Sequence, residues 1–124
     1  MAYVPCNAEW FFAQIVLEIR VAGSKRNVVH VNYVLVHASS PKDAFKRAMS
    51  MGKQGNSSYV NELGKRVTIR FRGLRDLDVI HDPLEDGCEI MYGERLGMTE
   101  RSLRKLVRPK RQLEVFLPIR ERRG

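Results

Sequence analysis

Cysteine is scarce in this chain. Cys6 and Cys88 are its only thiols, they stand in unrelated contexts, and neither belongs to a CxxC motif or a Cys/His cluster. A disulfide framework or a zinc site needs several such ligands at characteristic spacings. We therefore expect two reduced thiols in a cytoplasmic protein, and no metal or other cofactor.

Long apolar runs are also missing. The run from Trp10 to Leu17 is interrupted by Gln14 and ends before Glu18, whereas a membrane-spanning helix needs roughly 20 apolar residues. Residues 1–7 lack the cationic segment that opens a secretory signal peptide. The sequence accordingly predicts a soluble protein of the cytoplasm that has no contact with a membrane.

Patterns that carry common catalytic chemistry are absent from the sequence. Its glycines form neither a GxGxxG nor a GxxxxGK phosphate loop. His30 and His37 are seven residues apart on one predicted strand and face opposite sides, so a shared metal site is not expected. His81-Asp82 adjoins Pro83 and has no recognisable nucleophile beside it. We expect that the protein is not an enzyme.

Carboxylates concentrate between Asp76 and Glu89. Their oxygen atoms could hold a divalent cation, but the stretch lacks the spaced register of a calcium loop. In so basic a chain, pairing with Arg72, Arg75 or the C-terminal arginines is the better explanation.

What the chain does contain is a set of alternating apolar and polar segments. Residues 10–21 have one fully apolar face and one mixed face, and residues 28–38 are rich in valine. Both patterns are typical of long strands. The small and polar residues 22–27 between them predict a turn, which favours an antiparallel hairpin.

A third alternating segment, residues 65–77, has an apolar face opposite a cationic one. It follows a turn at residues 61–64, and we interpret it as the central strand, which the chain leaves through Gly73. Residues 59–60 approach this strand. The weaker alternation of residues 88–92 predicts a shorter strand.

The clearest predicted helix covers Pro41 to Met51. Ser40 can cap its N-terminus, Pro41 suits the first helical position, and Asp43 can complete a reciprocal cap. Gly52 is placed to end it. Lysines and an arginine fill the remaining side, as on the solvated face of an amphipathic helix.

The C-terminal region contains a second, shorter predicted helix. Thr99 is suited to be its N-cap, and Pro109 stops it. Beyond the helix, the alternation of Leu113, Val115 and Leu117 predicts either a last strand or an extended arm.

These elements together predict an α+β fold. We expect an antiparallel sheet of four to six strands, with one main amphipathic helix packed on one face and a short C-terminal helix. Residues 1–124 would form a single domain, of which residues 99–124 are a basic C-terminal extension.

The formal net charge of +8 is unevenly distributed. Residues 1–64 hold seven basic and four acidic side chains, and residues 65–100 hold six and eight. Residues 101–124 hold nine and two, so nearly all of the excess lies there. Such a patch attracts phosphates or acidic protein surfaces. A solvated face that maintains solubility is the competing interpretation.

A basic binding segment is the functional hypothesis that remains. We expect a small non-catalytic binding or accessory module that contacts an acidic protein partner, and sequence-tolerant nucleic-acid binding by the same residues is the alternative. The sequence leaves the oligomeric state open. The candidate binding residues are Arg101, Arg104, Lys105, Arg108, Lys110 and Arg111.

The alternating segments also carry a family resemblance. An opening Trp10-Phe11 pair, the helix SSPKDAFKRAMSMGK, the turn YVNELGKRV, the strand IRFRGLRDL and the close LEDGCEIMYGE together resemble the domain of unknown function 4288, an uncharacterised and mainly bacterial family. The resemblance runs from roughly Trp10 to Arg95. It implies a small α+β domain without assigned catalytic residues, and it leaves Met98 to Gly124 outside.

Overall fold

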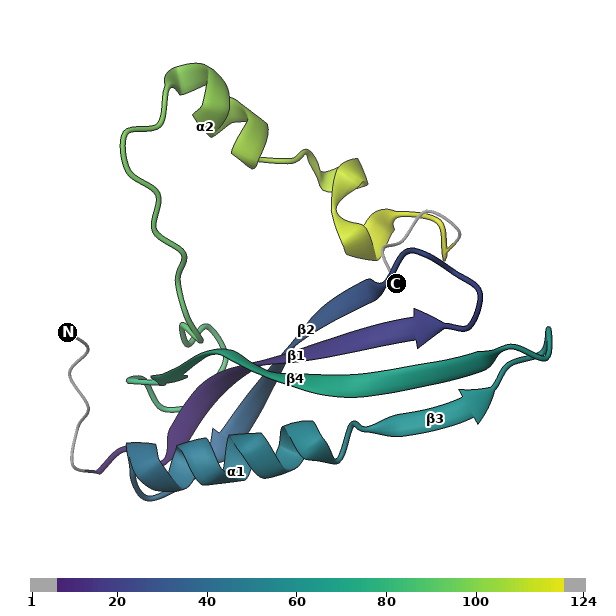
Figure 1. The fold of residues 1–124 in the computed structure, drawn as a ribbon. Helices are drawn as coiled ribbons and strands as arrows, with labels where there is room; N and C mark the ends of the chain where they lie inside the picture. The colour runs from purple at the N-terminus through teal and green to yellow at the C-terminus, as the bar shows by residue number, and fades with distance from the viewer. Residues whose placement is uncertain (1–6, 120–124) are drawn as a thin grey trace. The chain divides into compact units, whose positions relative to one another are not determined.

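The computed structural model describes residues 7–119. The chain divides into two compact units, one ending at Tyr92 and one beginning at Gly93. The first unit contains β1 (Trp10–Val21), β2 (Val28–His37), α1 (Pro41–Lys53), β3 (Ser57–Val60) and β4 (Arg66–Val79) (Figure 1). The second contains α2 (Glu100–Leu106) and two 3₁₀ turns, η1 (Lys110–Gln112) and η2 (Glu114–Phe116).

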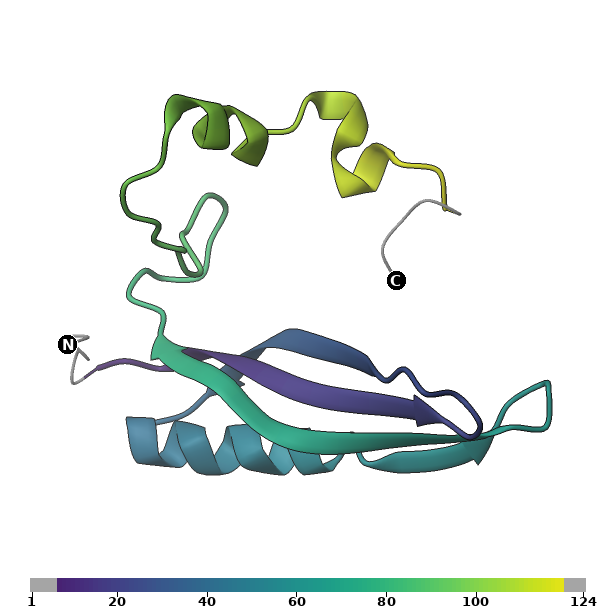
Figure 2. The ribbon, with the colours of Figure 1, turned by 45° about the horizontal axis from the view of Figure 1, so that its top comes forward.

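The first unit is an α+β fold built on a four-stranded sheet. The strand order is β2-β1-β4-β3, and each neighbouring pair is antiparallel. Figure 2 shows β2 and β3 at opposite margins of the sheet. The predicted fold class and both predicted long strands are therefore confirmed, and the segment before the turn at 61–64 is a separate strand, β3.

The strand β4 contains two β-bulges, which the sequence pattern did not predict. Its register with β1 shifts twice, so that no β1 residue lies directly opposite Arg72 or Arg75 in the ladder. Each extra residue reverses the alternation of faces. As a result, Leu74 and Leu77 reach the same face as Phe71, although these three residues are not evenly spaced by two.

The apolar face of β1 lies at the centre of the core. Phe11, Ala13 and Ile15 are buried there, each opposite an apolar residue of β4. Ala44 and Ala48, which are four residues apart on α1, belong to the same buried cluster. Small side chains at this spacing let a helix backbone approach a sheet closely.

The helix α1 begins where the sequence predicted and ends two residues later. The Oγ of Ser40 accepts from the N–H of Asp43 at 3.1 Å, and the Asp43 carboxylate accepts from the N–H of Ser39 at 3.2 Å. Gly52 does not end the helix but lies inside it, buried against the ring of Phe71. Its missing side chain makes room for that ring.

Two other sequence expectations in the first unit are wrong. The chain does not leave the strand at Gly73: β4 continues to Val79, because Gly73 still lies opposite Val16 beside the first bulge, at a φ of +131°. Residues 88–92 form no strand; a turn, in which the N–H of Cys88 donates to the carbonyl of Glu85 at 3.0 Å, opens this segment. The segment is only five residues long, the consecutive apolar residues Ile90 and Met91 break its alternation, and Gly87 and Gly93 flank it, so it offers too short a ladder for pairing.

The segment containing Leu113, Val115 and Leu117 is neither a strand nor an extended arm. The N–H of Phe116 donates to the carbonyl of Leu113 at 2.8 Å, so the backbone closes a 3₁₀ turn there. Prolines at 109 and 118 flank the segment, and each lacks the N–H that a strand ladder would need.

Candidate functional site

All six predicted binding residues fall in the second unit and are exposed. Arg101, Arg104 and Lys105 lie on α2, and Lys110 and Arg111 lie on η1. Arg108 stands between these two elements. The elements α2, η1 and η2 contain no buried residue. The cations therefore lie on segments that have no buried core residues of their own.

The helix α2 is short and is held locally at its N-terminus. Thr99 caps it as predicted, because its Oγ1 accepts from the N–H of Ser102 at 3.1 Å. The Nε of Arg104 pairs with a Glu100 carboxylate oxygen at 3.2 Å, one helical turn away. Both of these side chains are more than two thirds exposed, so water screens the pair and it contributes little to stability. Arg104 remains available to a partner.

An aromatic ring adjoins the cations of η1, which sequence reasoning missed. The Nζ of Lys110 lies 5.3 Å from the centre of the Phe116 ring, within the range of a cation–π contact. Together with Arg111, these residues line an open hollow of about 370 Å³. The two 3₁₀ turns place the Phe116 ring next to Lys110. The sequence did not indicate these turns, because the apolar residues of this segment alternate as they do in a strand.

Apolar side chains are exposed beside the cations. Leu103 and Leu106 of α2 are 47% and 49% exposed, and Phe116 is 52% exposed. A helix of seven residues does not gain enough from its own hydrogen bonds to be stable in water, and it normally depends on packing of an apolar face. In the described part of this unit, no residue of α2 is buried.

The polar face of the sheet is a weaker candidate, because its charged groups contact one another. Glu18 pairs with Arg20 at 3.0 Å and with Arg72 at 3.5 Å, and Asn27 donates to the same carboxylate. Arg75 donates to the Oε1 of the buried Gln14 at 3.1 Å. In the described residues, Arg72 and Arg75 thus contact β1 side chains, whereas Asp76 and Asp78 accept from backbone N–H groups next to them.

The contacts of the Glu18 carboxylate make the stability of the folded protein depend on pH. The hydrogen bond from Asn27, followed by the charges of Arg20 and Arg72, lowers the pKa of the Glu18 carboxyl from its ordinary value of 4.5. A lowered folded-state pKa contributes stability above the unfolded-state value, and that stability is lost as the pH falls through the folded-state pKa. We expect Glu18→Gln to unfold at a lower temperature than the unaltered protein at pH 7.

Acidification should narrow this difference. Thermal unfolding of both proteins, followed by circular dichroism between pH 7 and the acid range below 4.5, measures it. A difference that stays constant over this range would show that the carboxylate charge of Glu18 has no role in stability.

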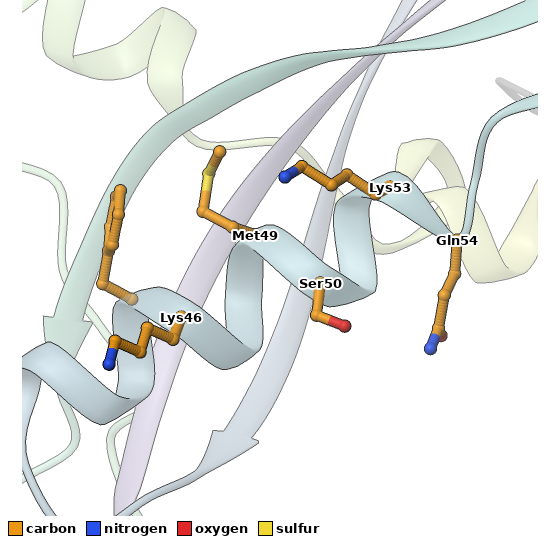
Figure 3. A pocket seen from close by; sticks show the side chains of 6 residues that line it. Lys46, Met49, Ser50, Lys53 and Gln54 are labelled. Atoms are coloured by element: carbon orange, nitrogen blue, oxygen red, sulfur yellow. The ribbon is translucent and has the colours of Figure 1, made fainter.

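A second open hollow lies on the outer surface of α1. Its volume is about 590 Å³, and Phe45 contributes its apolar wall together with Met49. Figure 3 shows Met49 and Lys53 pointing to one side of the helix and Lys46, Ser50 and Gln54 to the other. The side chains are separated along an exposed helix and do not converge on a common point, so the hollow has no evident chemistry.

No group of three or more His, Cys, Asp or Glu side chains in residues 7–119 could hold a metal ion. All three histidines are exposed, and the ring of His37 lies 4.8 Å from that of Trp10. Within the same part of the chain, no helix is both long and apolar enough to cross a membrane.

A family model described as "Domain of unknown function (DUF4288)" matches residues 10–92. The chain belongs to this family. The match to the DUF4288 domain begins at the first residue of β1 and ends at Tyr92, where the first compact unit also ends. The second unit, which contains the six candidate binding residues, therefore lies beyond the DUF4288 domain. No curated protein and no solved structure matches the chain.

Proposed function

We propose that this protein is a non-catalytic binding module whose C-terminal unit contacts an acidic protein surface. One observation carries the proposal: cations and apolar side chains are exposed together along α2 and the two 3₁₀ turns. Protein interfaces combine an apolar centre with a charged rim, and this unit offers both.

The apolar component favours a protein over a nucleic acid. Phosphates would neutralise Arg104 and Lys105 but would leave Leu103 and Leu106 exposed to water. A groove of an acidic protein would cover the leucines and pair with the cations, as in helix-in-groove recognition. The remaining stability of α2 would then come from its partner.

Nucleic-acid binding is the second candidate, and the Lys110–Phe116 contact favours it. An exposed aromatic ring beside Lys110 and Arg111 is a combination on which single-stranded bases stack. Binding that neutralised about four phosphates would weaken with salt with a log–log slope of about −3 to −4.

The test uses the full chain and three fluorescent probes. The first is an acidic peptide with leucine and glutamate at helical spacing, and the others are a single-stranded and a double-stranded oligonucleotide. One variant reverses four cations of the C-terminal unit, namely Arg104→Glu, Lys105→Glu, Arg108→Glu and Arg111→Glu. The matched control reverses four exposed cations of α1, namely Lys42→Glu, Lys46→Glu, Arg47→Glu and Lys53→Glu.

The two charge variants separate local from overall charge. Each reversal changes the charge by two, so both variants fall from a net charge of +8 to zero. We expect the C-terminal variant to bind the acidic peptide at least tenfold more weakly, with an unchanged melting temperature, because its side chains are exposed. The α1 variant should retain binding. Equal losses in both variants would contradict the proposal, as would a large loss of stability in the first.

A further pair of substitutions separates the two candidates. Leu103→Ser with Leu106→Ser removes the apolar component and leaves every cation in place. Peptide binding should weaken about tenfold, which corresponds to about 1.4 kcal/mol. Oligonucleotide binding that is insensitive to this change but steep in salt, without any peptide binding, would replace the protein partner with a nucleic acid.

A further inference from the structure

Among residues 7–119, no strand pairs with the outer edge of β2, and this edge lacks the features that usually protect an outer strand. Its ten residues, VVHVNYVLVH, include no lysine, arginine, aspartate, glutamate, proline or glycine. It pairs with β1 in one unbroken register from Trp10↔His37 to Ile19↔Val28. Natural edge strands are usually short, charged or bulged, because an open row of backbone groups pairs readily with another strand. The opposite edge strand, β3, has only four residues.

The hydrogen bonding of β2 identifies the backbone groups that point outward. The N–H of Ala38, directly after the strand, donates to the carbonyl of Glu9 at 2.9 Å. In an antiparallel pair, alternate residues bond to the same neighbour, so the even-numbered residues of β2 bond to β1. The N–H and C=O groups that face outward are those of Val29, Val31, Tyr33, Leu35 and His37.

We propose that two copies of the chain pair antiparallel through β2, about a two-fold axis perpendicular to the sheet. Such an axis keeps the same face of both sheets on one side, so odd-numbered residues oppose odd-numbered ones. In the register centred on Asn32, Val29 lies opposite the second copy's Leu35 and Val31 opposite its Tyr33. Every facing pair is uncharged.

The absence of charge along β2 lets a second copy approach this edge. Nearly all of the excess positive charge lies in residues 101–124, whereas β2 is a ten-residue strip without lysine, arginine, aspartate or glutamate, so like-charge repulsion does not act between two paired β2 strands. The side chains beside the edge are also apolar and exposed: Val29 is 52% and Leu35 is 45% exposed. Pairing would cover them and would satisfy the outward backbone groups. A second copy of β2 does so in the register centred on Asn32.

Sedimentation velocity of the full chain tests the proposal over about 1–200 µM. The protein should sediment as a dimer at the upper end of this range. Val29→Lys with Leu35→Lys places like charges opposite each other at both ends of the pairing, and we expect it to weaken dimerisation at least tenfold. The matched control, Tyr59→Lys with Val60→Lys, puts the same charges on the edge strand β3 at 48% and 55% exposure and should leave the dimer intact.

A cross-linking measurement covers the case in which the lysine variant does not fold. Asn32 lies on the two-fold axis in the proposed register, opposite Asn32 of the second copy. The backbone groups of this pair make no hydrogen bonds to each other, and the two Cβ atoms of such a pair are about 4.5–5.5 Å apart. Asn32→Cys should therefore form a disulfide-linked dimer on mild oxidation. His30→Cys, whose equivalents lie four residues apart along the pairing, should not, and the unaltered chain controls for its own thiols.

Three outcomes would overturn the proposal. They are a monomer throughout the concentration range, a dimer that tolerates the β2 lysines but not the β3 lysines, and cross-linking that is equal at residues 30 and 32.

Discussion

Replacing Phe11 with alanine is expected to lower the free energy of unfolding by about 3–5 kcal/mol. Its side chain is 2% exposed and lies on β1, one of the two inner strands of the sheet, opposite Val36 on one side and Val79 on the other. The substitution removes apolar contacts and leaves a cavity that the surrounding strands cannot close. Because domains of this size are stable by only about 5–15 kcal/mol, the loss is a large fraction of the total.

Chemical denaturation of the full chain measures this loss. Phe116→Ala is the matched control, since it removes the same ring from a side chain that is 52% exposed. That variant should stay within about 0.5 kcal/mol of the unaltered protein. Phe11→Leu should cost less than about 1.5 kcal/mol, because most of the volume is retained. Similar losses for Phe11→Ala and Phe116→Ala would show that the core is not centred on β1.

Replacing Gly52 with alanine should destabilise the protein by about 1–3 kcal/mol. In an exposed helix the same change would stabilise by about 0.5–1 kcal/mol, because glycine is the less favourable helix residue. Here a Cβ at position 52 would overlap the ring of Phe71, with three ring atoms too close for any real contact. The packing penalty therefore outweighs the gain in helix propensity.

A double-mutant cycle isolates the clash. Gly52→Ala should cost much less in a Phe71→Leu background, because the shorter side chain leaves room for the methyl group. Ser50→Ala, on an exposed position of the same helix, should be neutral or slightly stabilising. A stabilising Gly52→Ala in the original background would show that α1 can move away from β4.

Local patterns in the sequence were sufficient to locate β1, β2 and α1. The alternation in β1 extends over its full length, and Ser40, Pro41 and Asp43 form a helix start whose contacts are all within four residues. The structure of β4 depends instead on its pairing with β1. Gly73 marks an irregularity in the sequence, but only the register distinguishes a bulge from the end of a strand.

The candidate binding residues were predicted for a related reason. Clustered charge is visible in any sequence, so the position of Arg101 to Arg111 required no knowledge of the fold. Which apolar residues accompany these cations was less evident. Phe116 meets Lys110 through consecutive 3₁₀ turns, and a short segment between two prolines gives no periodic signal for such turns.

The two bulges in β4 also determine which changes of chain length the DUF4288 domain can accept. Arg72 and Arg75 are the residues with no β1 residue opposite them, so deleting either one would remove its bulge and leave Phe71, Leu74 and Leu77 opposite the same β1 residues on the inner face. Deleting a paired residue from the unbroken ladder between β1 and β2 would instead interchange inner and outer positions on one side of the deletion. Single-residue deletions should therefore be tolerated at the two bulges and not within β2.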